Sequence, residues 1–434
     1  MAHLSMNNAV SRRAFLKTTL LTTGGFWVAT QAGFARRFTA NEKLNLGVVG
    51  TINRARANID GVKGENIVAL CDIEHKLLAA AQARFPKART YTDFRRMLGR
   101  RDLDAVVIST PDHTHAVATM AALKSGRHVY CEKPLAHEVF EVRAVTEEAR
   151  KRKLATQMGT QIHAKDNYRR VVELIETGAI GPVSEVHVWC GRIYPGKPRP
   201  KETPPVPKGL HWDLWLGPAP ARPYHPTYQP RNWRTWWDFG GGVLGDMGCH
   251  YMDLAFWALK LRAPTNVEAE GPPLDSESTP AWLTVRYQFP ARRSLPGLQL
   301  TWYNGSKRPA LVEEGKAPSW SAGVLFIGAK GMLVADYGRW RLLPERDFAG
   351  FEPPAPYIPA SIGHHQEWIA ACKGGAEALC NFGYGGPLAE TVLLGNVAYR
   401  SGRKLEWDAR ACKVTNTREA DQLIHRQYRK GWKL

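Results

Sequence analysis

The sequence predicts an α/β protein with two domains. The first is a Rossmann domain with a doubly wound parallel sheet, and the second is an α/β domain with a large, open and mainly antiparallel sheet. The length of 434 residues exceeds that of one core, because about 150 residues per domain is typical. Short apolar runs alternate with helical patterns early in the chain, whereas later apolar runs are longer and alternate with polar residues.

The Rossmann domain is expected over residues 41–160. Its strands are predicted by five apolar runs, LNLGVV, NIVALCD, DAVVIST, HVYCEKP and LATQMG. Residues 74–85 and 139–153 have helical patterns and lie between such runs. This alternation is typical of a parallel sheet that helices cover on both faces.

The second domain is expected over residues 161–385. A helix over 166–177, closed by Gly178, precedes strands that we expect in three ranges: 185–189, 282–289 and 298–303. Residues 195–230 are dense in proline and predict an ordered loop over a cleft. Residues 386–434 form a C-terminal segment that packs back on the domains, with a helix over 387–400 after the turn-rich residues 383–386.

The composition excludes several classes of protein. With 44% hydrophobic and 23% charged residues, the chain is neither disordered, nor fibrous, nor a polytopic membrane protein. The formal net charge is +19, but it is spread along the chain without a zinc-finger spacing or a long basic run. We therefore expect no nucleic-acid partner and an affinity for anionic ligands or surfaces. Seven cysteines without a CxxC pair do not indicate a disulfide framework.

The first 37 residues resemble a twin-arginine export signal. The string SRRAFLK places Arg12 and Arg13 before a moderately apolar stretch that ends in small residues, where a peptidase could cut. We expect export to the periplasm, with cleavage of the signal or its retention left open. Beyond this signal we expect no integral membrane domain.

A dinucleotide-binding turn is predicted after the first strand. The sequence Gly50-Thr51-Ile52-Asn53-Arg54-Ala55 fits the GxGxxA pattern except that Ile52 stands at the middle glycine. Asp72 follows the second strand, where a carboxylate can accept hydrogen bonds from a ribose and would repel a 2′-phosphate. These residues favour NAD over NADP, while a Rossmann domain with an empty site stays open.

Two further strand ends are expected at the same crevice, because ligands of open α/β sheets lie beyond the carboxyl ends of the strands. The cofactor-binding residues predicted there are Thr110, Pro111, His115 and Glu132. His113 and His115 resemble a metal pair, but no third ligand has a suitable local spacing, so no metal site is predicted. Lys133 follows a strand that is expected to be buried and is predicted to bind the substrate hydroxyl or relay its proton.

The glycine-rich stretch from Gly240 to Asp253 is the most specific pattern of the second domain. If residues 246–260 are helical, Asp246 and His250 lie at i and i+4, with Asp253 one turn further on. The acid can then hold the imidazole while the other ring nitrogen reaches a substrate. The alternative is a helix cap followed by a core histidine.

Five tryptophans between residues 212 and 237 are interleaved with tyrosines and arginines. Such residues can form a carbohydrate platform, in which aromatic faces contact sugar rings and arginines bind hydroxyls or carboxylates. The predicted substrate-binding residues are Trp233, Arg234, Trp237 and Asp253. The same aromatic residues could instead hold the proline-rich loop to the core.

From Leu44 to its end the chain resembles the family of glucose-fructose oxidoreductase, inositol dehydrogenase and rhizopine-catabolism proteins (Gfo/Idh/MocA). The resemblance rests on ALCDI, TPDHTH, CEKP, NYRRVVELIETGAIGPV and GGGVLGDMGCHYMD. It implies a Rossmann domain followed by the open-sheet domain, and a catalytic set of Lys133, Asp246 and His250. Ile52 departs from the family pattern.

The resemblance implies hydride transfer from a sugar, polyol or sugar derivative to NAD. His250 would act as general base, Asp246 would orient it, and Lys133 would polarise the substrate oxygen. An exported member should retain and recycle its cofactor, because free NAD is not expected outside the cytoplasm. NAD-assisted glycoside cleavage and a non-catalytic sugar-binding role stay open, and a homo-oligomer is expected.

Overall fold

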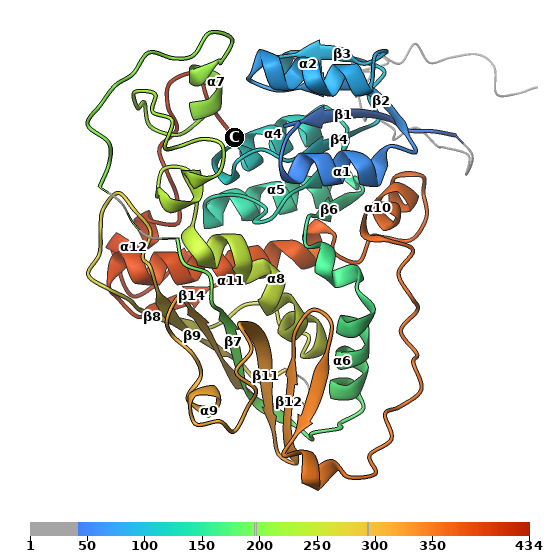
Figure 1. The fold of residues 1–434 in the computed structure, drawn as a ribbon, viewed down its shortest axis with the longest axis vertical. Coiled ribbons are helices and arrows are strands. Elements are labelled where there is room, and N and C mark those ends of the chain that lie inside the picture. The colour runs from blue at the N-terminus through green and yellow to red at the C-terminus, as the bar shows by residue number, and fades with distance from the viewer. Residues whose placement is uncertain (1–41, 195, 197, 293–294) are drawn as a thin grey trace, which may run out of the picture. The chain divides into compact units, whose positions relative to one another are not determined.

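The computed structural model describes residues 42–194, 196, 198–292 and 295–434. The first sheet has six parallel strands in the order β3-β2-β1-β4-β5-β6 (Figure 1). Their bounds are β1 Asn45–Val49, β2 Asn66–Cys71, β3 Arg89–Tyr91, β4 Ala105–Ile108, β5 His128–Cys131 and β6 Thr156–Met158. This is the strand order of a doubly wound dinucleotide-binding domain.

Helices cover both faces of this sheet, as the short apolar runs predict. They are α1 Arg54–Val62, α2 His75–Arg84, α3 Phe94–Met97, α4 Asp112–Lys124 and α5 Val139–Arg152. A sixth helix, α10 His364–Cys372, comes from far along the chain and packs against α1. Its buried Trp368 and Cys372 join the apolar cluster on that face.

The second sheet has nine strands in the order β13-β12-β11-β7-β10-β9-β8-β14-β15. Every pair is antiparallel except β7 with β10, so the predicted fold class is confirmed. The strands are β7 Val183–Cys190, β8 Asn266–Glu270, β9 Leu283–Phe289, β10 Leu298–Asn304, β11 Ala322–Gly328, β12 Gly331–Ala335, β13 Trp340–Leu343, β14 Leu405–Asp408 and β15 Lys413–Val414.

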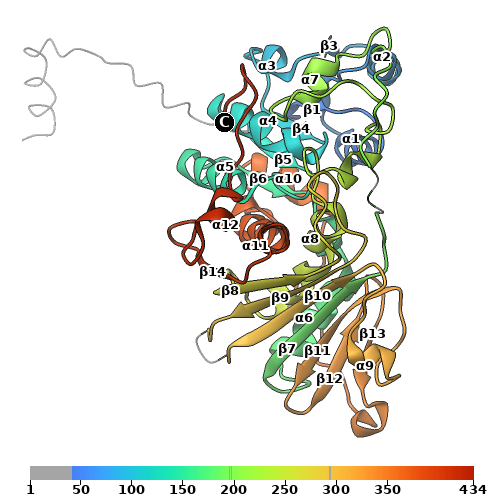
Figure 2. The ribbon, with the colours of Figure 1, turned by 90° about the vertical axis from the view of Figure 1, so that its left-hand side faces the viewer.

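One face of the second sheet is covered by helices (Figure 2). The long helix α8 Gly242–Ala258 lies on β7, β10 and β11, and α6 Asp166–Glu176 packs beside it. Helix α11 Phe382–Ser401 contacts α8, β8 and also α5 of the first domain. Helix α8 therefore has the sheet beneath it and carries its N-terminal residues toward the first domain.

The prediction of a turn at residues 383–386 is wrong, because these residues belong to the first turns of α11. The Asn381 side chain caps the helix by accepting hydrogen bonds from the N–H groups of Gly383 and Tyr384. Gly385 and Gly386 lie so close to Met158 and Thr146 that a Cβ atom would collide there. The glycines thus serve close packing, and a glycine-rich string alone cannot distinguish that from a turn.

The proline-dense segment reaches the Rossmann domain as an ordered strap, which we define as residues 207–217. The amide of His75 donates to the carbonyl of Gly209, and the amide of His211 donates to the carbonyl of Ile73. Within the strap, α7 Trp212–Leu216 stacks Trp212 on Trp215 with ring centroids 4.5 Å apart. The strap is therefore fixed directly beside the residues that follow Asp72.

The last described residues, 425–434, form a tail on the Rossmann domain. The guanidinium of Arg429 donates to the carbonyls of Asp213 and Gly217 in the strap. Trp432 packs on Phe94, with ring centroids 6.0 Å apart, and the guanidinium of Arg95 lies 4.5 Å from a Trp432 ring centroid. The tail thus joins the strap to the first domain.

The predicted export signal lies outside the described residues. Among the helices of the described chain, none combines the length and apolar character that crossing a bilayer requires.

Candidate active site

A cleft of about 1090 Å³ opens at the carboxyl ends of β1, β4 and β5. Its walls come from the β1–α1 turn, the strand ends, α8, the strap and the tail. Ligands of doubly wound folds bind in this position. Of the predicted cofactor-binding and catalytic residues, all twelve line this cleft: Gly50, Ile52, Asn53, Arg54, Asp72, Thr110, Pro111, His115, Glu132, Lys133, Asp246 and His250.

The β1–α1 turn explains how the chain tolerates Ile52. Gly50 has φ +87°, and a Cβ there would lie 2.8 Å from the Ser109 carbonyl oxygen, so glycine is required. The second residue of the turn with a positive φ is Asn53, with φ 53°, and not Ile52. With ψ −117°, Asn53 lies outside the left-handed helical region, in a backbone conformation that residues with a side chain rarely adopt. The turn therefore keeps an open N-terminus for α1 without the middle glycine.

Asp72 lies at the end of β2 with 8% of its surface exposed. Its carboxylate accepts hydrogen bonds from the amide and hydroxyl of Thr51, at 2.9 and 2.7 Å, and from the amide of Glu74 at 3.2 Å. Burial raises the pKa of Asp72, although these hydrogen bonds oppose the shift. The side chain is thus held where an adenosine ribose is expected.

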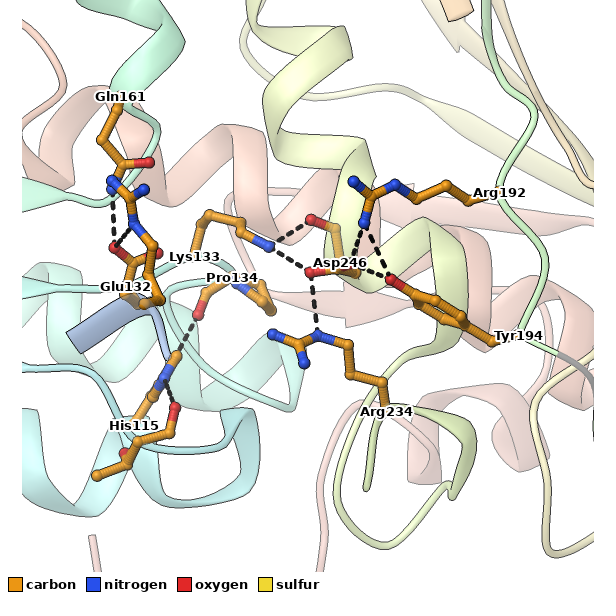
Figure 3. A network of polar contacts seen from close by, with 11 residues as sticks. His115, Glu132, Lys133, Pro134, Gln161, Arg192, Tyr194, Arg234 and Asp246 are labelled. Atoms are coloured by element: carbon orange, nitrogen blue, oxygen red, sulfur yellow. Dashed lines mark hydrogen bonds and ion pairs between the residues drawn. The ribbon is translucent and has the colours of Figure 1, made fainter. Parts of the chain in front are cut away.

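Asp246 is bonded by three side chains (Figure 3). Its Oδ1 lies 2.6 Å from Lys133 Nζ and 3.0 Å from Arg234 Nε, and its Oδ2 accepts a 2.5 Å hydrogen bond from the Tyr194 hydroxyl. Burial would raise the pKa of Asp246, but Lys133 and Arg234 outweigh burial and hold it well below its ordinary value. Lys133 and Asp246 therefore form a buried ion pair.

The expected bond between Asp246 and His250 is absent, so the prediction that Asp246 orients His250 is wrong. Both residues lie on α8 at i and i+4, but Lys133, Arg234 and Tyr194 occupy the carboxylate. Helical spacing predicts proximity and says nothing about competition from residues far along the chain. The Asp246 carboxylate pairs with Lys133 and Arg234 because an unpaired charge in a buried site is energetically costly.

The His250 imidazole lines the cleft, and its Nδ1 has no hydrogen-bond partner in the described part of the chain. Burial, and then the charge of Lys133, lowers the pKa of His250 well below its ordinary value. The ring is therefore neutral at neutral pH and can accept a proton. Its backbone is fixed by a 3.0 Å hydrogen bond from the Tyr168 hydroxyl to the His250 carbonyl.

Glu132 joins the end of β5 to the start of α1. Its Oε1 accepts hydrogen bonds from Arg54 Nε at 3.2 Å, Asn58 Nδ2 at 2.9 Å and Gln161 Nε2 at 2.7 Å. This side chain therefore fixes Arg54, the first residue of α1, against the end of β5. Gln161 lines the cleft too and carries no motif that would have marked it in the sequence.

His115 is held between two backbone carbonyls. Its Nδ1 lies 2.7 Å from the Pro134 oxygen and its Nε2 lies 2.8 Å from the Thr110 oxygen. Burial opposes a charge here, yet Cys131 and Asp112 raise the pKa of His115 to about 10. Both nitrogens can then donate, so His115 links the ends of β4 and β5.

The metal reading of the TPDHTH motif finds no support in the positions of its histidines. His113 packs between Trp215 and Phe239, and its Nε2 faces the Trp215 carbonyl at 2.8 Å. Among the described residues, no group of three or more His, Cys, Asp or Glu side chains could hold a metal ion.

Two predicted substrate-binding residues lie elsewhere than expected. Trp237 packs in the main core near Tyr399, and its Nε1 donates to the Asp275 carbonyl. Asp253 is fully buried and binds His163 Nδ1 at 2.9 Å and the Tyr384 hydroxyl at 2.6 Å. Neither lines the cleft: α8 turns Asp253 toward α11 and η1 Gln161–Ala164, and Trp237, which precedes α8, packs toward α11.

Trp233 and Arg234 do line the cleft, with the Arg234 guanidinium 4.2 Å from a Trp233 ring centroid. Trp233 is also buried with Tyr228, Phe239 and three other tryptophans, Trp212, Trp215 and Trp236, in one aromatic cluster. This cluster holds the proline-rich segment in place. From the sequence, a carbohydrate-binding platform and an anchor for the proline-rich loop are equally open. In the structure, most of these aromatic residues anchor the loop.

Several cleft residues had no sequence signal. Arg192 and Tyr194 follow β7 without a motif, and Tyr337 lies in the loop between β12 and β13. Trp432 of the tail lines the cleft with Phe94, at a distance of more than 300 residues along the chain. Only the tertiary fold brings such residues to one site.

Two family profiles match the chain. The profile described as "Oxidoreductase family, NAD-binding Rossmann fold" matches residues 44–160, and "Oxidoreductase family, C-terminal alpha/beta domain" matches residues 184–295. Together they cover more than half of the sequence. The chain belongs to the Gfo/Idh/MocA oxidoreductase family. Residues 44–160 are therefore the NAD-binding domain of this family.

Curated relatives are similar to about a third of this Gfo/Idh/MocA protein. Inositol 2-dehydrogenase of Salmonella typhimurium (strain LT2) is 30% identical over 153 residues, which is 35% of this chain and 44% of that protein. A glycosyl hydrolase family 109 protein of Solibacter usitatus is 34% identical over 150 residues, 30% of this chain and 34% of that protein. The chain thus spans less than half the length of these relatives.

Solved structures extend the likeness of the fold to the second domain. The WlbA dehydrogenase from Bordetella pertussis, in complex with NADH and UDP-GlcNAcA, has a TM-score of 0.62 at 18% identity. The match covers 85% of this chain and 98% of that one. The likeness concerns the fold alone, which is that of the Gfo/Idh/MocA family.

Proposed function

We propose that this protein is an NAD-dependent oxidoreductase that removes a hydride from a CH–OH group of a sugar, polyol or sugar derivative. The observation that carries the proposal is the buried Lys133–Asp246 pair, which shares one cleft with the Gly50–Arg54 turn and with His250, whose Nδ1 has no hydrogen-bond partner among the described residues. A cationic donor, a neutral base and a nucleotide turn in one cleft are what such a reaction requires.

The residues present fit NAD. The conformation of Gly50 leaves the N-terminus of α1 open to a pyrophosphate, and Asp72 stands at the position that binds a ribose. When bound there, NAD would supply the hydride acceptor. Glu132 keeps Arg54 in place at the same helix start.

Two residues of the chain would act on the substrate hydroxyl, and a third would position one of them. His250 accepts its proton, because burial keeps the imidazole neutral. Lys133 donates a hydrogen bond to the same oxygen and stabilises the negative charge that develops on it. Asp246 holds Lys133 in position through the 2.6 Å ion pair, and Tyr194 completes its hydrogen bonds.

The strap and the tail support retention of the cofactor between reactions. The strap pairs with residues 73–75, directly after Asp72, and Trp432 of the tail forms part of the cleft wall beside Phe94. Arg231 reaches the nucleotide turn from the second domain, with its Nη2 3.4 Å from Asn53 Oδ1. Contacts of this kind would enclose a dinucleotide and slow its release.

The experiment that tests the proposal is extraction of the native protein's bound nucleotide, followed by turnover. Acid-denatured protein should release close to one NAD per chain, and a sugar or polyol should raise nicotinamide fluorescence in a single turnover. Protein that carries and binds no NAD would overturn the proposal and leave a sugar-binding scaffold.

NAD-assisted glycoside cleavage is the second candidate, favoured by the 34% identity over 150 residues to the family 109 glycosyl hydrolase protein. Cleavage by transient oxidation and elimination requires no net change of NAD. Aryl glycosides separate the two candidates, because aglycone release without accumulating NADH indicates cleavage, whereas a stable keto-sugar indicates oxidation.

Export by the twin-arginine route is part of the proposal and is supported by the SRRAFLK string. The route carries folded proteins, which suits a cofactor that must be bound before export. Replacement of Arg12 and Arg13 by lysine should leave the protein in the cytoplasmic fraction. We also propose a homo-oligomer, which light scattering of the purified protein would test.

A further inference from the structure

Cations outnumber carboxylates at the end of the cleft that contains Lys133. Arg192, Arg234 and Lys133 all converge on Asp246 (Figure 3). One carboxylate therefore faces three cations. Lys165 adds a fourth cation to the lining, exposed and without an ionic partner in the described part of the chain.

Other charged groups nearby do not restore the balance. Asp112 is buried close to Lys133 and Arg234 and adds a second carboxylate, so two carboxylates face Lys133, Arg192, Arg234 and Lys165. His115 faces two carbonyls, and Cys131 and Asp112 raise its pKa to about 10, so a charge on His115 is balanced by these two groups and is not counted here. Glu132 is occupied by Arg54, Asn58 and Gln161. The net charge at this end of the cleft therefore remains positive.

Arg192 and Arg234 pair only some of their hydrogen-bond donors with other groups of the described protein. Arg192 is 58% exposed in its side chain, and its Nη1 lies 3.7 Å from Asp246 and 3.4 Å from the Tyr194 hydroxyl. Arg234 bonds Asp246 through Nε alone, and its terminal amino groups have no hydrogen-bond partner among the described residues. Trp233 packs on the Arg234 guanidinium and fixes its orientation. A pre-oriented guanidinium edge is suited to bidentate recognition of an anion.

The cofactor would not use these cations. Its pyrophosphate is expected at the start of α1, where Arg54 and Arg231 are available. Arg192 and Arg234 belong instead to the part of the cleft around Asp246, next to Lys133 and His250. A neutral sugar would leave their excess charge uncompensated in a partly buried site, which is unfavourable.

We propose that the substrate is a sugar derivative with a negative charge, a carboxylate or a phosphate ester, which Arg192 and Arg234 bind. The inference rests on the proposed function, since it names the class of substrate for the same site. Arg192 is the specificity-determining residue, because it is the more exposed of the two and makes the longer contact to Asp246.

The test is calorimetric titration of the NAD-loaded protein with matched sugars. Each set contains a neutral hexose, its uronate and its 6-phosphate, in the gluco, galacto and manno configurations. We expect one charged member to bind at least about tenfold more tightly than its neutral counterpart, a difference of about 1.4 kcal/mol. The preferred member identifies the anion as carboxylate or phosphate.

Variants connect the preference to the arginine. Arg192→Gln should reduce the preference to less than about twofold, whereas Arg341→Gln, which removes an exposed arginine of β13, should leave it intact. Equal or tighter binding of the neutral sugars in every set overturns the inference, as does a preference that survives Arg192→Gln. Single-turnover fluorescence separates the two proposals. Hydride transfer from neutral sugars alone supports the oxidoreductase function and refutes the anionic substrate. Tight binding of a charged sugar without any hydride transfer supports the anionic ligand and refutes the oxidoreductase function.

Discussion

Among single residues, Asp246 has the strongest influence on the charge of the site. It is the only carboxylate bonded to Lys133 in the described chain, and it binds Arg234 and Tyr194 at the same time. Burial and the charge of Asp246 raise the pKa of Tyr194 to about 12, so the phenol remains a hydrogen-bond donor. Asp246 therefore sets the position of Lys133 and the protonation of its neighbours.

Lys133→Met should remove hydride transfer and leave NAD binding intact. We expect the rate to fall about 100- to 10,000-fold, because the variant loses the donor to the substrate oxygen. The measurement is single-turnover nicotinamide fluorescence, together with the NAD content after denaturation. Lys330→Met, at an exposed position after β11, is the control. A fully active Lys133→Met protein would refute the catalytic assignment.

Asp246→Asn should destabilise the fold, although the substitution changes no volume. Lys133 and Arg234 would be left in a buried site without their counter-charge, and loss of one partner from a buried pair costs roughly 3–5 kcal/mol. Urea denaturation measures the change in the free energy of unfolding. Asp347→Asn, at an exposed residue, should change it by less than about 0.5 kcal/mol. Equal stability of both variants would contradict this account.

Single residues also show what the sequence could predict. Lys133 and His250 were identifiable because each lies in a short motif after a predicted strand or in a predicted helix. The partners of Asp246 were not, because Arg192 and Tyr194 reach it across the cleft from the end of β7. Trp237 and Asp253 were placed wrongly because composition and spacing do not reveal which face of an element meets the core.

At the level of elements, five of the six parallel strands were predicted closely, β3 (Arg89–Tyr91) was not predicted, and the helix starts were predicted less well. Strand positions follow from short apolar runs, which the first sheet buries on both faces. The starts of α8 and α11 lie before the predicted residues because glycines there pack closely: a Cβ at Gly386 would meet Thr146, and one at Gly242 would meet Thr279. Glycine in such places reflects contact, which propensity cannot predict.

The β1–α1 turn gives a direct test. Gly50→Ala would place a methyl group 2.8 Å from the Ser109 carbonyl oxygen at φ +87°. We expect a loss of about 1–3 kcal/mol in stability and a reduced NAD content, because the turn must move. Gly64→Ala is the matched control, since it meets open space. Thermal unfolding and nucleotide extraction of both variants check the prediction, which fails if they behave alike.

The start of α10 should make stability depend on pH. His364 Nε2 bonds the Met158 carbonyl at 2.9 Å, and burial lowers the pKa of His364 to about 3. The unfolded chain, with a pKa of about 6.5, then binds more protons between pH 6.5 and 3. The contribution of His364 to the free energy of unfolding is therefore greatest above pH 6.5. Below pH 6.5 it decreases by up to about 1.4 kcal/mol per pH unit.

His364→Gln should flatten this dependence. The variant loses the titrating group, so its unfolding free energy should fall less steeply from pH 6.5 to 4 than that of the native chain. His425→Gln, at an exposed position, should keep the native slope. Urea denaturation over this pH range measures both, and identical slopes for all three proteins would contradict the role of His364.

On the scale of the whole molecule, four distant parts of the chain enclose one cleft. The Rossmann domain supplies the floor, α8 supplies His250 and Asp246, and the strap and tail close the outer edge. The two-domain plan could be predicted from the alternation of strands and helices. The C-terminal segment was expected to pack back on the domains, but the contact of its Trp432 with Phe94 of α3 was not, because no local pattern indicates it.

Trp432→Ala should accelerate release of the nucleotide. The substitution removes a cleft wall that packs on Phe94, and we expect about a tenfold higher dissociation rate, equivalent to about 1.4 kcal/mol. Stopped-flow displacement of bound NADH measures the rate. Lys430→Ala, an exposed neighbour in the tail, should release NADH as the native protein does. Unchanged release from Trp432→Ala would show that the tail does not retain the cofactor.

The place of the tail in the chain also orders events during synthesis. Residues 426–432 leave the ribosome long after the six parallel strands, so the nucleotide turn faces an unfinished edge while the rest of the protein is made. A dinucleotide captured in that interval meets a cleft without its tail, whereas one that arrives later meets the cleft with the contacts of Arg429 and Trp432 already in place. Loading in the cell and reloading of the purified protein should therefore differ in rate.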